Sequence, residues 1–268
     1  MVEITSVHNP RVKAAVRLRD RRYREKQGQI LIDGARELLR AFEGGVKVQE
    51  VFTCEKLCDS TECRRALAVA VDHGAQIIHV TEPVFAKLAF GQRAEGVLAV
   101  AEMPLRKLAD LQLSGNQLLA VLEGVEKPGN LGAVVRSADA AGIAAVIAAD
   151  PICDLYNPNA IRASLGAIFT VPICAETSAT VLDWLRRGGI KIVAARVDAS
   201  RLYTEIDYRH PTAVVLGSEA QGLSHLWDSP DVTAVRLPML GKVDSLNVSA
   251  AAAVIFYEAR RQRGVDNL

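Results

Sequence analysis

Three polar side chains in the second half of the chain follow predicted strands and could act on a bound ligand. Asn130 begins a predicted helix shortly after the apolar run Leu118–Leu122, and Arg136 lies nearly two turns along that helix. Glu219 follows the apolar run Ala213–Leu216. Because ligands of parallel sheets bind beyond the carboxyl ends of the strands, an amide, a guanidinium and a carboxylate at these positions indicate a polar site.

A second loop, between a strand and the last helix, could hold a small ligand through its backbone. The strand Ala234–Leu237 is expected to stop at Pro238, which has no N–H to give to a sheet. Asp244 and Ser245 occupy the expected N-cap of the alanine-rich helix that follows, and Ser245 and Asn247 place two polar side chains at the rim. The same pattern also fits an ordinary packing unit with a capped helix.

The second half of the chain is predicted to be a parallel sheet covered by helices on both faces. Its apolar runs are nearly continuous, which is typical of strands that are buried on both sides. The predicted strands are Leu118–Leu122, Ala145–Ala149, Ile168–Ile173, Ile190–Ala195, Ala213–Leu216 and Ala234–Leu237, and the predicted helices between them are Asn130–Ala141, Asn157–Leu165 and Thr180–Arg187.

Residues 1–102 are predicted to form a separate, smaller α/β domain, and residues 103–116 a linker to the domain at 117–268. Strands and helices alternate in this first part, as in a compact α/β unit. The predicted strands are Gln29–Ile32, Val48–Thr53, Gln76–Val80 and Gly96–Ala101, and the predicted helices are Gly34–Phe42, Glu62–His73, Glu82–Leu88 and one that opens at Pro10.

Charge is distributed unevenly, although the net charge of the chain is only +1. Residues 1–26 carry eight Arg or Lys against three acidic residues, so the remainder of the chain is net negative. A basic segment on a nearly neutral protein is typical of an arm that binds a polyanion such as RNA, with a solvated helix face as the alternative. The candidate RNA-binding residues of this arm are Arg11, Arg17, Arg21 and Arg22.

The five cysteines fit reduced thiols better than a disulfide framework, because their number is odd. Cys54, Cys58 and Cys63 are close enough in sequence to suggest zinc. A nearby fourth ligand is missing and the spacing matches no common zinc finger, so we expect no metal.

Composition limits the class of protein further. The 268 residues are 50% hydrophobic and 24% charged, which is typical of a globular protein with one large or two ordinary domains. Neither an apolar run long enough to span a membrane nor the apolar core of a signal peptide occurs, so we expect a cytoplasmic protein. Neither G-x-G-x-x-G nor G-x-x-x-x-G-K-[ST] occurs, which argues against a nicotinamide or nucleotide-hydrolysing enzyme.

Three segments together resemble the signature motifs of the SpoU (TrmH-like) branch of the SPOUT RNA methyltransferases. They are N-L-G-A-V-V-R from Asn130 to Arg136, V-L-G-S-E-A-Q-G-L from Val215 to Leu223, and L-P-M-L-G-K-V-D-S-L-N-V-S-A-A-A-A from Leu237 to Ala253. The resemblance covers residues 118–262 in the right order and spacing. The first domain resembles the α/β substrate-binding domain, related to small ribosomal RNA-binding proteins, that many members carry. The overall plan is similar to that of the ribosomal RNA 2′-O-methyltransferases that confer thiostrepton-type resistance.

The resemblance implies a parallel-sheet domain with a deep trefoil knot, S-adenosylmethionine bound in the knot, and homodimers packed through the knot region. It implies that the cofactor is held largely through backbone groups and apolar contact, by Leu216, Gly217, Ser218, Gly222, Leu237, Pro238, Met239 and Leu246. It assigns the catalytic site to Asn130, Arg136, Glu219, Ser245 and Asn247. Arg162 is a candidate clamp for an RNA phosphate.

Within the family, the residue matching Arg136 is proposed to accept the proton of the ribose hydroxyl. A guanidinium stays protonated in nearly any protein setting, so we expect Arg136 to act mainly by lowering the pKa of the hydroxyl and steering the adjacent phosphate. The predicted activity is 2′-O-methylation of a ribose in structured RNA, with ribosomal RNA favoured. The alternatives are methylation of a transfer RNA ribose or of an RNA base, and a non-catalytic RNA-binding protein that keeps the knot.

Overall fold

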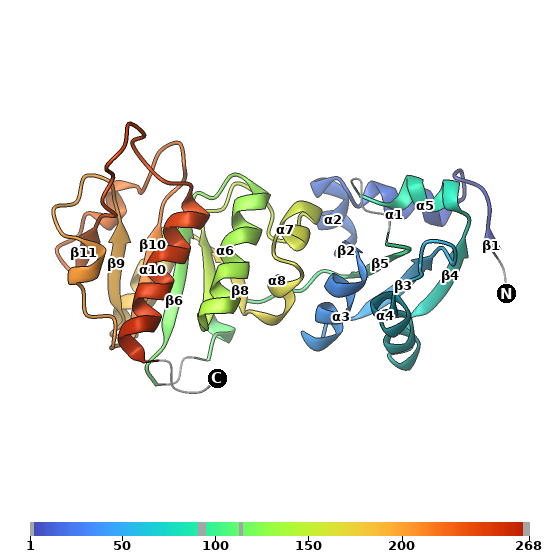
Figure 1. The fold of residues 1–268 in the computed structure, drawn as a ribbon, viewed down its shortest axis with the longest axis horizontal. Coiled ribbons are helices and arrows are strands. Elements are labelled where there is room, and N and C mark those ends of the chain that lie inside the picture. Colours follow the sequence, from blue (N-terminus) through green and yellow to red (C-terminus); the bar gives the residue numbers. More distant parts are fainter. Residues whose placement is uncertain (1–2, 91–94, 113–114, 265–268) are drawn as a thin grey trace. The chain divides into compact units, whose positions relative to one another are not determined.

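A computed structural model describes residues 3–90, 95–112 and 115–264, and residues 113–114 of the expected linker lie outside these ranges. The chain divides into two compact units. The first contains residues 1–104 together with 156–170, and the second contains residues 105–155 and 171–268. Each unit has its own sheet (Figure 1).

The first unit is built on a mixed five-stranded sheet in the order β1-β4-β3-β5-β2. Strand β5 runs antiparallel to β2 and β3, whereas β4 pairs in parallel with β1 and β3. Its strands are β1 (Glu3–Ile4), β2 (Gln29–Asp33), β3 (Val48–Thr53), β4 (Gln76–Val80) and β5 (Val97–Glu102). Its helices are α1 (Pro10–Arg17), α2 (Arg21–Gln27), α3 (Ala35–Glu43), α4 (Thr61–Asp72), α5 (Glu82–Leu88), α7 (Pro158–Ala163) and α8 (Ala167–Thr170).

The segment 156–170 leaves the second unit after β7 and completes the packing of the first unit. The side chains of Ile161 and Ile168 are buried, and Arg40 of α3 donates a hydrogen bond to the carbonyl of Leu165 at 3.0 Å. At Gly44 an added Cβ would lie 2.2 Å from the carbonyl oxygen of Phe169. The expected division of the chain did not include this excursion, because local sequence does not say which unit a short helix packs against.

The second unit contains a six-stranded sheet in which every pair of neighbouring strands is parallel, in the order β11-β9-β10-β6-β7-β8. The side chains of the central strands are buried, which explains their continuous apolar runs. The strands are β6 (Leu118–Glu123), β7 (Ala145–Ala149), β8 (Ile173–Glu176), β9 (Lys191–Ala195), β10 (Thr212–Leu216) and β11 (Val232–Val235). The helices are α6 (Pro128–Ala141), α9 (Ser178–Arg187) and α10 (Val248–Arg263), with short 3-10 turns η1 (Leu108–Asp110), η2 (Tyr203–Glu205) and η3 (His225–Trp227). Helices α6 and α10 pack side by side (Figure 1).

Two of the predicted strands are wrong in part. The expected strand Ile168–Ile173 is instead the helix α8 followed by β8, which starts at Ile173. A short buried apolar run has no periodicity that separates a strand from a helical turn, so the sequence could not distinguish them. The last strand ends at Val235, before Leu237, and therefore Pro238 is not the residue that stops it.

The N-cap of the last helix is also corrected. Asn247, rather than Asp244 or Ser245, caps α10, because its side-chain oxygen accepts a hydrogen bond from the N–H of Ser249 at 3.0 Å. Asn, Asp and Ser are all good N-caps, and the stretch offers all three within four residues. Local preference therefore could not select among them.

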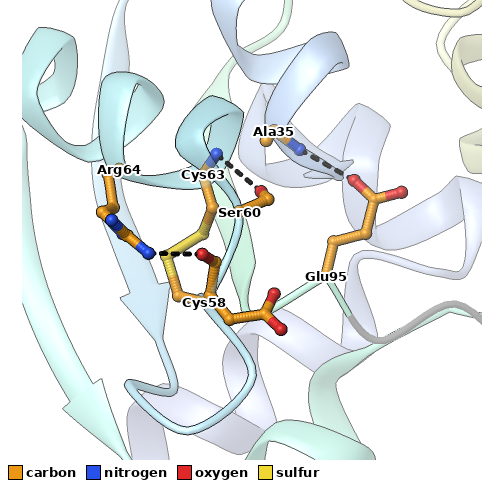
Figure 2. The surroundings of a disulfide bond; sticks show 7 residues. Ala35, Cys58, Ser60, Cys63, Arg64 and Glu95 are labelled. Carbon is orange, nitrogen blue, oxygen red and sulfur yellow. Dashed lines mark hydrogen bonds between the residues drawn. A yellow bond between two sulfur atoms is a disulfide. The ribbon is translucent and has the colours of Figure 1, made fainter.

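The expectation of reduced thiols is wrong for one pair of cysteines. Cys58 and Cys63 form a disulfide at the start of α4, where the side chain of Ser60 caps the helix by accepting from the N–H of Cys63 (Figure 2). Cys54 is a free, buried cysteine. An odd total says nothing about one local pair, and a spacing of five residues lets two side chains meet across a turn.

Candidate functional site

The loop that follows β10 is closed tightly on itself by two glycines. An added Cβ at Gly217 would lie 2.2 Å from the carbonyl carbon of Gly222, so only glycine fits there without a backbone shift. Ser218 and Gly222 exchange backbone hydrogen bonds of 3.2 and 3.0 Å, and Gly222 has a positive φ of 68°. This Gly217–Gly222 loop carries Glu219 out beyond the carboxyl end of the sheet.

A cavity of about 470 Å³ lies between the Gly217–Gly222 loop, the end of β9 and the segment that leads from β11 into α10. This volume is in the range of small-molecule sites, about 300 to 1,000 Å³. Seven of the eight residues predicted to hold the cofactor line the cavity, and Pro238 is not among the lining residues. The seven are Leu216, Gly217, Ser218, Gly222, Leu237, Met239 and Leu246.

The lining of this cavity fits S-adenosylmethionine. Leucine, valine, methionine and alanine side chains supply apolar surface for a flat ring, and the strand end at Leu216 and the glycine loop bring peptide groups to the wall. Charged groups are present at one end, where Arg196 pairs with Asp198 at 3.0 Å. Within the described ranges, no three His, Cys, Asp or Glu side chains gather where they could hold a metal ion.

Four polar side chains form one hydrogen-bonded group, which we call the cavity cluster: Lys127, Asn130, Glu219 and Asn247. Glu219 lines the 470 Å³ cavity and also a smaller cavity, which Lys127 and Asn130 line as well. The ammonium of Lys127 lies 2.7 Å from one carboxylate oxygen of Glu219, and the amide nitrogen of Asn247 donates to the other. The same amide nitrogen lies 3.3 Å from the side-chain oxygen of Asn130. The cluster thus joins the N-cap and first turn of α6, the Gly217–Gly222 loop and the N-cap of α10.

The cavity cluster is polarised by its ion pair. The hydrogen bond from Lys127 lowers the pKa of Glu219, and Glu219 in turn raises the pKa of Lys127. The pair is open to solvent, with 70% of the Lys127 side chain exposed. The carboxylate can accept a hydrogen bond from a ribose hydroxyl, and the two side-chain amides can both donate to a ribose and accept from it.

Two of the predicted catalytic residues stand apart from the cavity cluster. Ser245 is exposed and lines the 470 Å³ cavity. Arg136 is exposed on α6 and lines neither that cavity nor the smaller one beside Asn130. Across the described residues, no hydrogen bond or ion pair of the Arg136 side chain is found.

The predicted RNA-binding arginines of the basic arm lie on α1 and α2, and all four are exposed. Arg11 is 3.8 Å from Glu50, Arg21 pairs with Glu25 at 2.7 Å, and the Arg17 guanidinium lies 5.6 Å from the ring centre of Tyr23. Two other arginines of this segment turn inward instead. Arg19 donates to three carbonyls at the end of α5, and Arg24, 1% exposed, donates to the carbonyls of Leu18 and Arg19.

Arg162 lies in the first unit, in α7, and donates a hydrogen bond to the carbonyl of Phe90. The N–H of Phe90 donates to Asp33 at 2.6 Å. Burial raises the pKa of Asp33 to about 6, although the Phe90 N–H and the charge of Arg162 act in the opposite direction. The structure therefore gives Arg162 a partner inside the first unit, and its role as a phosphate clamp stays a prediction.

Lys127 and the pair Arg196–Asp198 lie at the site but were not among the residues predicted from the sequence. Arg196 and Asp198 follow β9 directly, so the rule that ligands bind beyond strand ends would have singled them out. Lys127 had no comparable signal, because a lysine before a helix is usually a solvated residue. Its importance follows only from the position of Glu219, which is 92 residues away in the sequence.

Comparison with known proteins gives two family matches and close structural neighbours. Residues 117–257 match the SpoU rRNA Methylase family, and residues 9–99 match the MRM3-like substrate binding domain. The 23S rRNA (guanosine(2553)-2′-O)-methyltransferase RlmP of Bacillus subtilis is 28% identical over 261 residues, covering 97% of this chain and 100% of that protein. A crystal structure of an RNA 2′-O ribose methyltransferase is 41% identical, with a TM-score of 0.87 over 98% of this chain and 99% of that chain. The SpoU methyltransferase AviRb of Streptomyces viridochromogenes, solved with the cofactor AdoMet, is 30% identical, with a TM-score of 0.86 over 96% of this chain and 98% of that chain.

Proposed function

This chain belongs to the SpoU rRNA methylase family, and we propose that it methylates the 2′-hydroxyl of a ribose in ribosomal RNA with S-adenosylmethionine. The observation that carries the proposal is the cavity of about 470 Å³ together with the cavity cluster, which reaches the cavity wall through Glu219. RlmP is named as a 23S rRNA 2′-O-methyltransferase and the matched family as an rRNA methylase family, which favours ribosomal RNA over transfer RNA.

S-adenosylmethionine, when bound, supplies a methyl group on a sulfonium, a transfer that is downhill and needs no metal. The residues of this chain then have two tasks, which are to hold the ribose in line with that methyl group and to favour loss of the hydroxyl proton. Asn130 and Asn247 can orient the ribose through their amides. Glu219 is ionised and can accept a hydrogen bond from a ribose hydroxyl, and Lys127 holds it in place.

Arg136 is the residue that assists deprotonation, and in this proposal a second copy of the chain brings it to the site. The support is geometric. Arg136 lies away from both cavities of its own chain, whereas α6, which carries it, packs beside α10. Helix α10 and the preceding loop expose several large apolar side chains, as expected of a surface that a partner covers. They are Leu240 (98% exposed), Val243, Leu246, Val254 and Tyr257.

The C-terminal segment forms the trefoil knot of the SPOUT fold in this proposal. After β11 the chain runs beside residues 201–203, which follow β9. Arg236 donates a backbone hydrogen bond to Arg201 at 2.9 Å and accepts one from Tyr203 at 3.1 Å. The chain then passes the Gly217–Gly222 loop on its way into α10, so both loops that border the cavity belong to the threaded region.

The first unit, which matches a substrate-binding domain, holds the RNA through the exposed face of α1 and α2. The structure separates the cations of this segment into those that fix the fold, Arg19 and Arg24, and those that point to solvent. Tyr23, 38% exposed under the guanidinium of Arg17, adds an aromatic ring on which a base can stack. Binding of ribosomal RNA would place the protein in the cytoplasm, and none of the described helices is long and apolar enough to cross a membrane.

The test uses the full chain and radiolabelled S-adenosylmethionine, with ribosomal and transfer RNA offered separately in the presence of a chelator. We expect label in ribosomal RNA and a gap in the alkaline hydrolysis ladder at the modified nucleotide, because a methylated 2′-oxygen cannot attack the adjacent phosphate. Label without a gap would indicate that the enzyme methylates a base. Label in transfer RNA alone would contradict the proposal that ribosomal RNA is the substrate. If calorimetry at millimolar S-adenosylmethionine shows no binding, the protein is not a methyltransferase that uses this cofactor.

A further inference from the structure

Glu123 is a buried carboxylate at the centre of the second unit that none of the roles above uses. It is the last residue of β6 and is 7% exposed. A buried charge is costly unless it is hydrogen-bonded, and the partners of Glu123 are both on one residue. The N–H of Ser224 donates to one carboxylate oxygen at 2.7 Å and the Ser224 hydroxyl donates to the other at 2.8 Å.

Ser224 stands where the chain leaves the wall of the cavity. Every residue from Leu216 to Leu223 lines the 470 Å³ cavity, and Ser224 is the next residue. The entry into this wall is also fixed to β6, because Leu216 pairs with Leu122 in the sheet. Two neighbouring residues of β6, Leu122 and Glu123, therefore hold the entry and the exit of the same loop.

An ion pair between this part of the chain and the loop is weaker. Lys127 reaches Glu219, but the pair is exposed, and solvent screens exposed ion pairs. Hydrogen bonds to a buried carboxylate are stronger, because water does not compete for them. Trp227, three residues after Ser224, is buried in the core and anchors η3 there. It therefore fixes the segment that follows the loop, but it does not fix Ser224 itself.

We propose that Glu123 is a positioning residue for the cofactor: its carboxylate fixes Ser224 and so holds the wall from Gly217 to Leu223 in the shape that binds S-adenosylmethionine. Glu123 lines the smaller cavity beside Asn130 and not the 470 Å³ cavity, so it acts on the cofactor only through this loop. The inference rests on the proposed function, since it takes the cavity to be the cofactor site. If the bound shape falls to a tenth of the population, the apparent dissociation constant rises about tenfold while the saturated rate is kept.

The experiment compares Glu123→Ala, Glu123→Gln and Ser224→Ala in the full chain, with cofactor affinity measured by calorimetry for S-adenosylmethionine and S-adenosylhomocysteine. Glutamine can still accept from the N–H of Ser224, and its amide can donate to the Ser224 oxygen, so it should keep nearly wild-type affinity. Glu123→Ala should raise both dissociation constants about tenfold or more, and Ser224→Ala, which loses only the hydroxyl, about threefold. Single-turnover rates at saturating cofactor should stay within about threefold of wild type.

Asp150 provides the matched control. It follows β7, the neighbour of β6, and its carboxylate accepts from the N–H of Ser178 at 2.9 Å, away from the cavity. Asp150→Ala should lower the melting temperature without changing cofactor affinity. Cofactor affinity of Glu123→Ala within twofold of wild type overturns the proposal. If Glu123→Ala does not fold, unchanged affinity in Ser224→Ala overturns it, whereas a wild type that binds no cofactor refutes the proposed function instead.

Discussion

Two clusters of charged and polar side chains in this protein each contain a carboxylate with a shifted pKa, and the two shifts are in opposite directions. The cavity cluster is open to solvent, and its carboxylate, Glu219, has a lowered pKa because Lys127 donates to it. In the first unit, the carboxylates of Asp33, Glu37 and Glu95 interact with one another, and Arg162 interacts with Asp33; we call these four residues the first-unit cluster. Burial raises the pKa of Asp33 to about 6 and also raises that of Glu37.

The difference shows that a perturbed pKa alone does not mark the site of chemistry. The carboxylates of the first-unit cluster accept hydrogen bonds from backbone N–H groups, with Asp33 bound to Phe90 and Glu95 bound to Ala35 at 3.3 Å. Such bonds fix a turn and a helix end. The cavity cluster joins side chains of three separate segments beside a cavity, and that arrangement, rather than the size of a pKa shift, indicates a reaction site.

The largest effect on catalysis is expected from Arg136, which lies on α6 in the same unit as the cavity cluster. Arg136→Ala should lower the single-turnover rate with saturating RNA and cofactor by a factor of about 100 to 1,000, because the role proposed for this residue is in the transition state. Arg136→Lys should also be badly impaired, since lysine keeps the charge but loses the planar fork. Cofactor affinity should change little.

A mixing experiment then tests whether Arg136 acts from a second copy. Arg136→Ala mixed with Glu219→Ala should recover part of the lost activity, because a mixed dimer would contain one site with both residues intact. Arg136→Ala turning over within a few-fold of wild type would mean that Arg136 is only a helix residue. No recovery in proven mixed dimers would place Arg136 and Glu219 on the same chain.

A smaller effect is expected from Glu219→Gln, which removes the charge of the cavity cluster and keeps its shape. Losing a charged acceptor of Lys127 and Asn247 should lower kcat/KM about tenfold or somewhat more. Lys127→Met removes the main cause of the lowered pKa of Glu219, so the acidic limb of the pH–rate profile should move to higher pH. Full activity in Glu219→Gln would show that the charge of the cavity cluster plays no part in the reaction.

The exposed cations of the first unit should affect RNA binding without affecting the cofactor. Replacing Arg17, Arg22 and Lys26 with alanine should weaken RNA binding about tenfold and flatten its salt dependence, because fewer phosphate contacts release fewer counterions. Calorimetry with S-adenosylmethionine serves as the control and should be unchanged. An unchanged salt slope would show that these charges are merely a solvated helix face.

The smallest effect on activity is expected from Asp33→Asn, the counterpart of Glu219→Gln in the first-unit cluster. A folded pKa of about 6 against 3.8 means that the stability contributed by Asp33 is full below about pH 3.8 and is lost as the pH rises through about 6. The variant lacks this titration. The free energy of unfolding of Asp33→Asn should exceed that of wild type. The difference should increase between pH 5 and pH 7.5 and reach about 2 kcal/mol.

Denaturant unfolding at several pH values measures this difference, and the methylation rate of Asp33→Asn should equal that of wild type. A pH-independent difference would mean that Asp33 titrates normally. A tenfold loss of activity with intact stability would show that the first-unit cluster takes part in the reaction. The two clusters would then not differ in function.

The sequence predicted the parts of this structure that periodicity and strand ends determine. The bounds predicted for β3, β4, α5 and β7 are those observed, because their apolar runs end at clear turn residues. The position of Glu219 beside the cavity followed from the rule for parallel sheets. The remainder depends on contacts between distant residues, such as the partner of Arg162 at Phe90, and no local pattern encodes those.

The excursion of residues 156–170 has a consequence for the order in which the protein is made. A ribosome adds about 5 to 20 residues per second, so the 66 residues from 105 to 170 appear about 3 to 13 s after the first unit's last strand. During that interval α3 lacks the partners that α8 later provides. The first unit therefore cannot finish folding as an N-terminal module, and its completion waits until β6 and β7, two of the six strands of the second sheet, have already been synthesised.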